Sequence, residues 1–405
     1  MKIFESARIG NLVLKNRIIR SATYEGMCTD GFPTDKYKNL YIDLAKSGVG
    51  CIITGFAYIA SNGKAMQPNQ TGIDSSERIP SFKNITDEVH NYDCKIIMQI
   101  FHPGRQTIKE ANQGKVYGVS NIKSHYFNSN PEVLTKEQIL SIADKFAEAA
   151  SYAKQAGFDG VQVHAAHGYL IHQFLLSAIN NRKDEFGIDP ATGIGTKFLD
   201  IVIDKIRDKC GPDYPVLVKV SGSDDYKKAF NEAQFIEFVK FLDKKKVSGI
   251  EVSYGTMDYP LNIIRGKSIP VDLILRINPR YKIKNKMVRA MFKKLMAPFM
   301  LKQFKSYSPM YNLPFAKIAK QNTDIPVICV GGFRKGEDIS SVVEQGTVDF
   351  VSLCRPFICE PDFAAKLEKD KAYISKCIDC NICSIMTDSG NGTRCYKGNS
   401  NIQGG

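Results

Sequence analysis

Eight short runs of apolar, mostly β-branched residues recur along the chain, and each run ends in a cluster of small or polar residues. Between most of these runs, apolar residues recur every three to four positions, which is the spacing of one helix face. The strand-like runs cover residues 17–22, 50–56, 95–101, 160–164, 216–221, 249–254, 326–331 and 350–355, and the clearest helical segments cover 76–92, 139–153, 196–209, 231–245 and 336–345. Continuous apolar strands that alternate with helices are typical of a parallel sheet covered on both faces.

The number of these strand–helix units predicts the fold class. Eight units fill about the length that one barrel with insertions requires, so we predict an α/β protein with a (β/α)8 TIM barrel over residues 1–370. An open, doubly wound sheet is the alternative, but no glycine-rich dinucleotide turn follows the first strand. The remaining residues, 371–405, are expected to form a separate cysteine-rich tail.

The most informative stretch surrounds the fourth predicted strand. A helix stopped by Gly157 leads into the apolar run, and His164, His167 and Tyr169 follow at its carboxyl end. Barrels and open α/β sheets place their chemistry at that end, so these three side chains are candidate catalytic residues. The two histidines could instead be a metal pair, but neither a third ligand nor an H-E-x-x-H pattern accompanies them.

Positive charge is concentrated in one segment between the sixth and seventh predicted strands. Residues 265–320 hold 14 Lys and Arg and one acid, Asp272, so this segment alone carries +13, which is the net charge of the whole chain. The insertion, at about 262–312, is longer than a barrel loop requires. Its Met, Phe and Leu spacing over 287–304 predicts one or two amphipathic helices.

Several interpretations of this insertion are open. The simplest is a solvated basic lid over the barrel mouth. A site for acidic groups, such as those of a CoA-linked or phosphorylated substrate, is a second, and a membrane surface or an acidic redox partner is a third. Nucleic acid is disfavoured, because the basic residues lack the interleaved aromatic side chains on which single strands stack.

Cysteine usage sets the tail apart from the rest of the chain. Seven of the 11 cysteines are scattered singly as small core or loop residues, whereas Cys377, Cys380, Cys383 and Cys395 lie within the last thirty residues. The N-terminus has no apolar signal region, so a disulfide framework is not expected. A C-x2-C-x2-C run with a distant fourth cysteine predicts the ligands of one 4Fe-4S cluster. A structural zinc site and an incidental cysteine-rich tail are the alternatives.

Length and composition agree with a large folded domain. The chain has 405 residues, of which 43% are hydrophobic, so it can bury a sizeable core without disulfides. No stretch approaches 18 uncharged apolar residues, which predicts the absence of a transmembrane helix. We therefore expect a cytoplasmic protein. The sequence leaves open whether it forms a homo-oligomer.

Five separated motifs carry a resemblance to a known family. They are LKNRIIRSAT, MQIFHPGRQ, AGFDGVQVHAAHGYLIHQFLLSAINNRKDEFG, VICVGGF and VDFVSLCRPFICEPDF, in this order between residues 12 and 367. In these motifs the chain resembles the old yellow enzyme family of flavin-dependent NADH:flavin oxidoreductases. The cysteine tail resembles the cluster segment of longer members, 2,4-dienoyl-CoA reductase and trimethylamine dehydrogenase. Those proteins continue into nucleotide-binding domains, whereas no GxGxxG occurs in this sequence.

The resemblance implies an FMN site at the carboxyl ends of the strands, with the phosphate on the loops after the seventh and eighth strands. The positions that match the family's FMN-binding residues are Ala22, Thr23, Tyr24, Phe56, Gln99, Lys219, Gly331, Gly332, Cys354 and Arg355. Lys219 stands where the family usually has arginine, and it keeps the charge but not the bidentate fork. Tyr24 stands beside the flavin N5–O4 edge, where relatives often carry Thr or Cys, so the flavin potential is left open.

The same resemblance assigns roles to the three candidate catalytic residues. His164 and His167 match the pair that donates hydrogen bonds to a substrate carbonyl oxygen, and Tyr169 matches the donor of a proton to the α-carbon. It implies reduction of the activated C=C bond of a small-molecule enone, enal or enoyl thioester. The electrons would come from NAD(P)H, or from an external carrier through the tail cluster. Amine oxidation or demethylation resembling trimethylamine dehydrogenase, and an electron-transfer module for a partner protein, are the alternatives.

Overall fold

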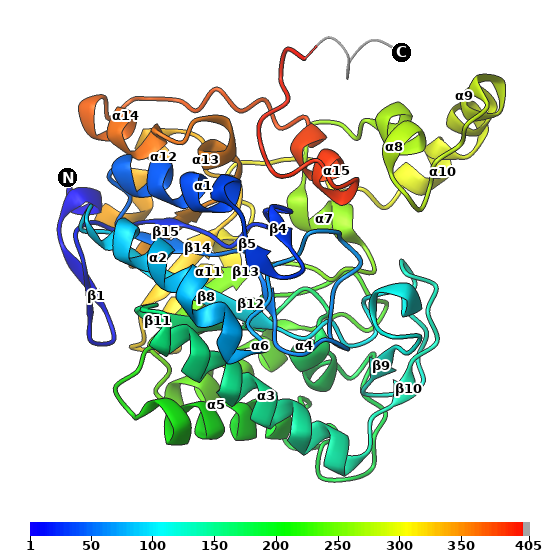
Figure 1. Cartoon of the computed structure of the whole chain (residues 1–405), viewed down its shortest axis with the longest axis horizontal. Helices are drawn as coiled ribbons and strands as arrows, with labels where there is room; N and C mark the ends of the chain where they lie inside the picture. The colour runs from blue at the N-terminus through cyan, green and yellow to red at the C-terminus, as the bar shows by residue number, and fades with distance from the viewer. Residues whose placement is uncertain (400–405) are drawn as a thin grey trace.

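Eight parallel strands form a closed barrel in the computed structural model, which describes residues 1–399 apart from the side chain of Met300 (Figure 1). In their order around the ring, the barrel strands are β3 (Ile18–Arg20), β6 (Cys51–Ile53), β8 (Lys95–Phe101), β11 (Gly160–Ala165), β12 (Val216–Ser221), β13 (Gly249–Ser253), β14 (Val327–Val330) and β15 (Phe350–Leu353). Pairing of β15 with β3 and of β8 with β11 closes the ring. Each strand overlaps one of the eight predicted runs, so the (β/α)8 prediction is confirmed.

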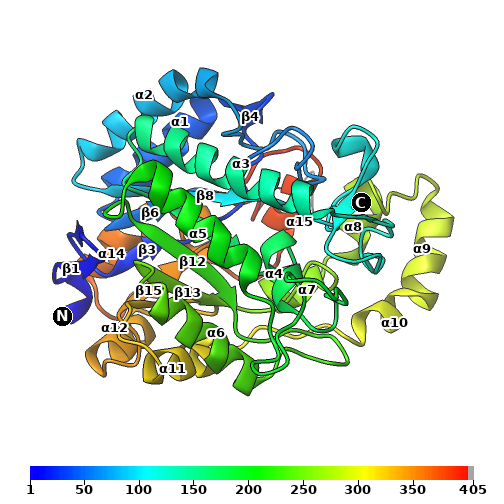
Figure 2. The ribbon, with the colours of Figure 1, turned by 90° about the horizontal axis from the view of Figure 1, so that it is seen from below.

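Helices surround the barrel and cover the outer faces of its strands (Figure 2). The covering helices are α1 (Asp35–Lys46), α2 (Ile79–His90), α3 (Lys136–Gln155), α5 (Lys197–Cys210), α6 (Glu232–Lys244), α11 (Leu313–Gln321), α12 (Gly336–Glu344) and α14 (Phe363–Lys369). Capping boxes begin two of these helices, with Thr135 before α3 and Asn231 before α6. The largest hydrophobic cluster fills the space between this layer and the strands.

The amino-terminal end of the barrel is closed by apolar side chains. A hairpin of β1 (Ala7–Ile9) and β2 (Leu12–Leu14) supplies two of them, and the barrel strands supply the rest. The cluster consists of Ile9, Leu14, Ile19, Cys51, Ile53, Ile97, Leu217, Ile328 and Phe350, all at most 1% exposed. Because this end is filled, the barrel interior can open only toward the carboxyl ends of its strands.

Short elements in the loops and at the amino terminus complete the fold. They are η1 (Lys2–Phe4), β4 (Cys28–Thr29), β5 (Phe32–Pro33), β7 (Ala57–Tyr58), η2 (Ser76–Arg78), η3 (Lys109–Ala111), β9 (Tyr117–Gly118), β10 (Glu132–Val133), α4 (Leu170–Leu175) and α13 (Arg355–Cys359). Strands β4 and β5 form an antiparallel pair, β9 and β10 a parallel one, and β7 pairs with the end of β8. Except for η1, these elements follow carboxyl ends of barrel strands and enlarge the walls above them.

The predicted insertion lies between β13 and β14 and projects from the barrel (Figure 1). It contains α7 (Pro260–Ile264), α8 (Val271–Ile277), α9 (Lys286–Leu295) and α10 (Ala297–Leu301). The apolar spacing predicts amphipathic helices over 287–304, and α9 and α10 lie in this range except that α9 begins one residue earlier. We refer to α8, α9 and α10 together as the basic lobe.

The cysteine-rich tail packs back on the basic lobe. Its helix α15 (Ile382–Asp388) contacts α8, and Leu273, Ile385, Met386 and Tyr396 form a small separate core between them. The division into a barrel over 1–370 and a tail over 371–405 stays a prediction, and residues 400–405 of that tail lie outside the described residues. Across residues 1–399, no helix is both long and apolar enough to cross a membrane.

Candidate active site

One cavity of about 700 Å³ lies at the carboxyl ends of the barrel strands. All thirteen residues predicted as catalytic or FMN-binding line it: Ala22, Thr23, Tyr24, Phe56, Gln99, His164, His167, Tyr169, Lys219, Gly331, Gly332, Cys354 and Arg355. These residues follow different strands and are far apart in the sequence. Closure of the barrel therefore brings the whole predicted set to one place.

The floor of this cavity is a layer of buried polar side chains. Gln99 and Lys219 lie two residues after Ile97 and Leu217, which belong to the apolar cluster at the amino-terminal end of the barrel. Side chains two residues apart on a strand point the same way, so Gln99 and Lys219 also point into the barrel, one layer closer to the carboxyl ends. The Gln99 Nε2 donates to Gln162 Oε1 at 2.6 Å, and the Gln162 Nε2 donates to Glu251 Oε2 at 2.8 Å. A connected polar network thus crosses the barrel where the resemblance expects the flavin pyrimidine ring.

Glu251 is the centre of this network and was not identified from the sequence. Its Oε2 lies 3.0 Å from the Lys219 Nζ, and its Oε1 accepts bonds of 2.6 Å from the hydroxyls of Ser21 and Ser352. Burial alone would raise the pKa of Glu251, but Lys219 and the hydrogen bonds hold it below its ordinary value. The buried charge of Lys219 therefore has a partner within the protein.

The three candidate catalytic rings lie against one another above this floor. The ring centroid of His164 is 4.9 Å from that of His167 and 4.9 Å from that of Tyr169. His167 has φ of +59°, a left-handed conformation that is unusual for a residue with a side chain and that concentrates at functional sites. The His167 Nε2 lies 2.9 Å from the Ser253 hydroxyl oxygen, so a neutral ring that accepts this bond carries its proton on Nδ1.

Protonation states follow from the burial of these rings. Burial is the main cause that lowers the pKa of both His164 and His167, with the positive charge of Lys219 adding to it. Both imidazoles are therefore neutral near pH 7. The backbone N–H of Ala166 donates to His164 Nδ1 at 3.3 Å, which leaves the His164 Nε2 to carry the ring proton. Burial raises the pKa of Tyr169, so its phenol keeps its proton.

Aromatic side chains line the cavity above the first two strands. The Tyr24 ring centroid is 5.1 Å from that of Phe56, and the Tyr24 hydroxyl donates to the backbone oxygen of Pro68 at 2.5 Å. Phe56 in turn lies 5.8 Å from the Tyr169 ring. Tyr24 thus occupies space that a Thr or Cys would leave free.

The opposite end of the cavity has features of a phosphate site. Gly331 and Gly332 have φ of +123° and +82°. A Cβ would lie 2.7 Å from Tyr311 at the first position and 2.5 Å from the Met310 nitrogen at the second. Only glycine therefore fits this turn, and its backbone stays open to a ligand.

Two guanidinium groups lie beside this turn. Arg334 and Arg355 both line the cavity and both contact one carboxylate, Asp379 of the tail, which Arg355 approaches to 3.2 Å. Arg355 also donates to Asn381 Oδ1 at 2.9 Å. Two cations that share one anion leave a net positive charge, so the residues present fit the FMN that the resemblance implies. Neither Arg334 nor Asp379 was identified from the sequence.

The tail also places an acid in the cavity wall. Asp388, at the end of α15, lines the cavity, and the Gln67 Nε2 donates to its Oδ1 at 3.3 Å. Burial raises the pKa of Asp388 to about 6, and the Gln67 bond opposes this shift. Asp388 lies close enough to Tyr24 and Tyr169 to raise their pKa values as well.

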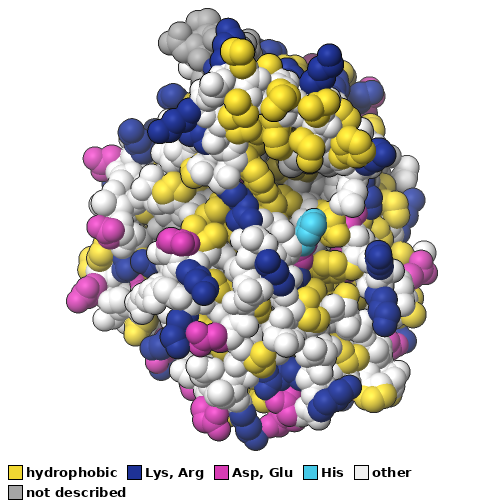
Figure 3. Space-filling view, turned by 90° about the vertical axis from the view of Figure 1, so that its right-hand side faces the viewer, with side chains coloured by type: hydrophobic (Ala, Val, Ile, Leu, Met, Phe, Trp, Pro, Cys, Tyr) yellow, Lys and Arg dark blue, Asp and Glu magenta, His cyan; other side chains and the backbone are white. Residues whose placement is uncertain are grey.

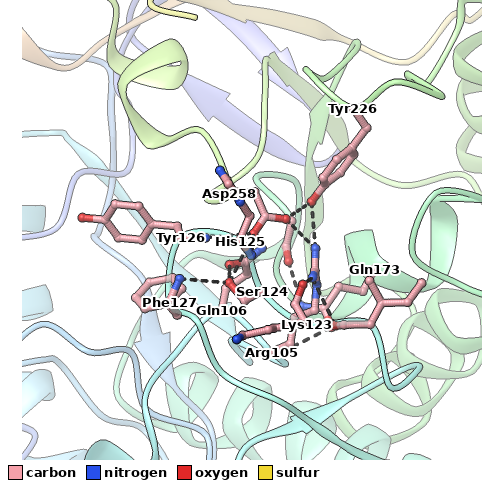
Figure 4. Close-up of polar contacts among 12 residues, drawn as sticks. Arg105, Gln106, Lys123, Ser124, His125, Tyr126, Phe127, Gln173, Tyr226 and Asp258 are labelled. Carbon is pink, nitrogen blue, oxygen red and sulfur yellow. Dashed lines mark hydrogen bonds and ion pairs between the residues drawn. The ribbon is translucent and has the colours of Figure 1, made fainter. Parts of the chain in front are cut away.

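A buried ion pair fixes the loop that covers the cavity (Figure 4). Arg105 and Asp258, whose side chains are 2% and 1% exposed, pair directly. The Asp258 Oδ1 also accepts from the backbone nitrogen of His125 at 2.8 Å and from the Ser124 hydroxyl at 3.2 Å. Through Asp258 the loop after β13 holds the loop after β8, and so holds the cavity-lining Tyr126 in place.

The four predicted cluster cysteines lie around one small space. Cys377, Cys380, Cys383 and Cys395 line a cavity of about 20 Å³ together with Cys359, whose thiol is hydrogen-bonded to that of Cys395. Within residues 1–399, no three His, Cys, Asp or Glu side chains converge closely enough to hold a metal ion. The ligand types fit a cluster or a zinc site, and neither arrangement is preformed among the described residues.

No Lys or Arg side chain that the structure describes in residues 265–320 lines the cavity. The residues of this segment that line the cavity are Ile274, Asn278, Tyr281, Phe299, Gln303, Phe304, Tyr311 and Asn312, and none of them is basic. A direct role of these Lys and Arg side chains in holding an acidic substrate group therefore has no support in the described structure.

Comparison with known proteins identifies the family. The sequence profile of the NADH:flavin oxidoreductase / NADH oxidase family matches residues 2–270 and 281–373. The chain belongs to this family. It is 33% identical to an NADPH dehydrogenase of Listeria welshimeri over 90% of the chain and 93% of that protein. It is 28% identical to an NADH oxidase of Thermoanaerobacter brockii over 94% of the chain and 53% of that protein. The chain thus spans about half the length of the latter relative.

Solved structures with the same fold include two enzymes. A complex of 2-naphthoyl-CoA reductase with 2-naphthoyl-CoA matches with a TM-score of 0.81, at 21% identity over 99% of this chain and 57% of that one. An old yellow enzyme homologue from Zymomonas mobilis matches with a TM-score of 0.73, at 22% identity over 98% of both chains. At these identities the likeness establishes the fold, and family membership establishes an oxidoreductase.

Proposed function

We propose that this family member is an FMN-dependent ene-reductase that reduces the activated C=C bond of an enone, enal or enoyl thioester. The observation that carries the proposal is the meeting of the His164, His167 and Tyr169 rings, at centroid distances of 4.9 Å, in the same cavity as every expected FMN-binding residue. FMN, when bound, supplies the hydride. The names of the NADPH dehydrogenase relatives support NAD(P)H as the reductant.

The chain's own residues supply the remaining chemistry in this proposal. His164 and His167 are neutral and can each present an N–H to a carbonyl oxygen, where negative charge grows as the β-carbon accepts hydride. Tyr169 retains its proton because its pKa is raised, and it lies beside His164, so it can protonate the α-carbon. The rings of Phe56 and Tyr169 make the adjoining part of the cavity wall apolar.

Replacement of Tyr169 by Phe tests this assignment. We expect Tyr169→Phe to slow enone reduction on the order of 100-fold, because a positioned proton donor typically contributes at least that much. Reduction of the flavin by NAD(P)H should stay unchanged, since that half of the reaction needs no proton from the phenol. Stopped-flow measurement of the two half-reactions separates them. An equal slowing of both would remove Tyr169 from the proton-donor role.

A second candidate function, oxidation of an amine, is favoured by one observation. Asp388 places a carboxylate among Tyr24, Tyr126 and Tyr169 in the cavity wall, and carboxylates and aromatic rings together attract ammonium groups. A relative with 25% identity, from Chromohalobacter salexigens, is named N,N-dimethylglycine/sarcosine dehydrogenase. The chain covers 50% of that protein.

The pH dependence of turnover distinguishes this candidate. The pKa of Asp388 is raised to about 6, so its carboxylate is charged above that pH. If amines are the substrates, their KM should fall as pH rises through about 6, and Asp388→Asn should remove this change. Reduction of a neutral enone should show no such requirement. Absence of any turnover with secondary or tertiary amines, at every pH, would reject amine oxidation.

We propose that Cys377, Cys380, Cys383 and Cys395 hold one 4Fe-4S cluster, supported by the single small cavity that all four line. Metal analysis after anaerobic purification should find about four irons and four acid-labile sulfides per chain. One zinc without iron would contradict this assignment. Such a cluster would allow an external electron carrier as the donor, whereas a pure electron-transfer module would not need the His164–His167–Tyr169 group.

We also propose a cytoplasmic location. All 11 cysteines lie within the described residues, and all of them are unpaired. Proteins of reducing compartments usually keep their thiols free, whereas secreted proteins tend to pair them.

A further inference from the structure

Helix α9 of the basic lobe presents an apolar face that nothing in the described chain covers. Met287, Met291 and Leu295 recur four residues apart, so they share one face, and they are 79%, 58% and 56% exposed. Phe299 of α10 continues this face with 64% exposure. Six of the eleven large hydrophobic side chains exposed in the described chain fall between residues 287 and 299, so the face is a single concentrated patch.

Basic side chains surround this face. Lys286, Arg289, Lys293 and Lys294 alternate with the apolar residues along α9, and Lys302 follows α10. Figure 3 shows hydrophobic side chains gathered over the projecting lobe, with Lys and Arg side chains at its edges. The only acid of residues 265–320, Asp272, already pairs with Arg276 and Arg289. Most of the positive charge around the patch is therefore without a partner in its own segment.

The patch is continuous with the mouth of the active-site cavity. Phe299 belongs to the exposed face and also lines the cavity, and its neighbours Gln303 and Phe304 line it too. Whatever covers the patch must therefore lie at the cavity entrance.

We propose that the α9–α10 face docks on an anionic lipid surface and makes this chain a peripheral membrane protein. An apolar helix face bordered by lysines matches the acyl boundary and the phosphate layer of such a surface. Docking would place the mouth of the cavity against the membrane. The proposal does not depend on which reaction the cavity supports.

Two other occupants fit the observations less well. A second copy of the chain would bring two rings of lysines and arginines together across a twofold axis, where like charges repel. A peptide helix needs a groove to enter, and the lobe's own cavity of about 640 Å³, between α8, α9 and α10, is not lined by Met287, Met291, Leu295 or Phe299. A bilayer interface accepts a projecting apolar face without a groove.

Sedimentation with lipid vesicles tests the proposal on the purified 405-residue chain with its cofactors. We expect the chain to pellet with phosphatidylcholine vesicles that contain phosphatidylglycerol and to stay largely in solution with pure phosphatidylcholine. Lys293→Glu/Lys294→Glu should weaken binding to the anionic vesicles at least about 25-fold, because each basic residue near such a surface contributes about fivefold. Met291→Glu/Leu295→Glu should abolish binding to the anionic vesicles.

Matched variants elsewhere on the surface provide the control. Val13 and Ile374, which are 44% and 56% exposed, lie outside the lobe, so Val13→Glu/Ile374→Glu should bind vesicles like the wild type. Lys36→Glu/Lys209→Glu repeats the charge reversal at exposed lysines of α1 and α5. Flavin absorbance and the elution volume of every variant show whether it is folded and whether its oligomeric state has changed.

Three results would overturn the proposal. One is equal sedimentation with and without anionic vesicles. Another is the same loss of binding in the control variants as in the lobe variants. The third is a concentration-dependent dimer that Met291→Glu/Leu295→Glu disrupts while vesicles bind neither protein, which would assign the face to a second copy of the chain.

Discussion

Replacement of both His164 and His167 by alanine should lower the rate of enone reduction on the order of 10³- to 10⁴-fold. Loss of one anion-stabilising donor typically costs 10²- to 10³-fold, and the two losses are not fully additive. The same double variant should bind a para-substituted phenol more weakly, because a phenolate oxygen would occupy the place of the substrate's carbonyl oxygen. The shift of the flavin spectrum on titration with the phenol measures this affinity.

Two control variants make the result specific. His164→Asn keeps an N–H donor, so its loss of rate should be smaller than that of His164→Ala. His90 lies on α2, away from the cavity, where it pairs with Asp159 at 2.8 Å, so His90→Ala should leave turnover unchanged. Unaltered phenol affinity in the double alanine variant would contradict the anchoring role of the pair.

Replacement of Glu251 by leucine should lower the free energy of unfolding by about 3–5 kcal/mol. The variant leaves the ammonium group of Lys219, 4% exposed, without its carboxylate, and removal of one partner of a buried ion pair typically costs this much. Restoring an apolar pair with Glu251→Leu/Lys219→Leu should recover much of the loss. Urea unfolding at neutral pH, followed by circular dichroism, measures each difference.

A surface pair and a pH series test the cause of this effect. Glu237 and Lys240 pair at 3.0 Å but are exposed, so Glu237→Leu should cost under about 1 kcal/mol. The pKa of Glu251 is lower in the folded state than in the unfolded one, so its contribution is complete above the unfolded value of about 4.3. It is lost as pH falls below that value. A difference between wild type and Glu251→Leu that stays constant down to pH 3 would contradict the ion-pair explanation.

The barrel was predictable because its signals are local. Each strand is an apolar run of a few residues, and each run is read without knowledge of its partners. The structure shortens most of them. For example, the run 17–22 becomes β3 (Ile18–Arg20), because Ser21 and Ala22 turn toward the cavity, where one joins the polar floor and the other lines the wall. The candidate catalytic residues His164, His167 and Tyr169 were found for the same reason, since they lie at the end of such a run, whereas the FMN-binding positions came from the family resemblance.

Residues that depend on contacts between distant segments were not predicted. Glu251 meets Lys219 only because β12 and β13 pair in a register that sets these two residues side by side. The sequence did contain one signal for this pair, because Glu251 is the only acid in its apolar run and Lys219 is the only base in the preceding run. Asp388 and Asp379 had no such signal, since the tail reaches the cavity through contacts with segments far away in the sequence, such as α8 and the backbone of Tyr24.

The amphipathic helices of the insertion were predicted, but the direction of their faces was not. Periodicity shows that α9 has an apolar side, yet it does not show whether that side packs on the barrel or faces outward. In the structure none of the residues of α9 is buried. The charge pattern had suggested a site for acidic substrates, whereas the cavity wall is formed by neutral side chains of the segment.

The direction of electron flow is tested most directly by one stopped-flow experiment. The chain is loaded with FMN, the flavin is reduced anaerobically, and the protein is mixed with cyclohexenone. The flavin absorbance at about 450 nm is then followed. The ene-reductase proposal predicts that the absorbance returns at a rate that saturates with enone, with one cyclohexanone formed per flavin. A reduced flavin that stays stable with enone, while the oxidised protein is bleached by dimethylglycine or another tertiary amine, would contradict it.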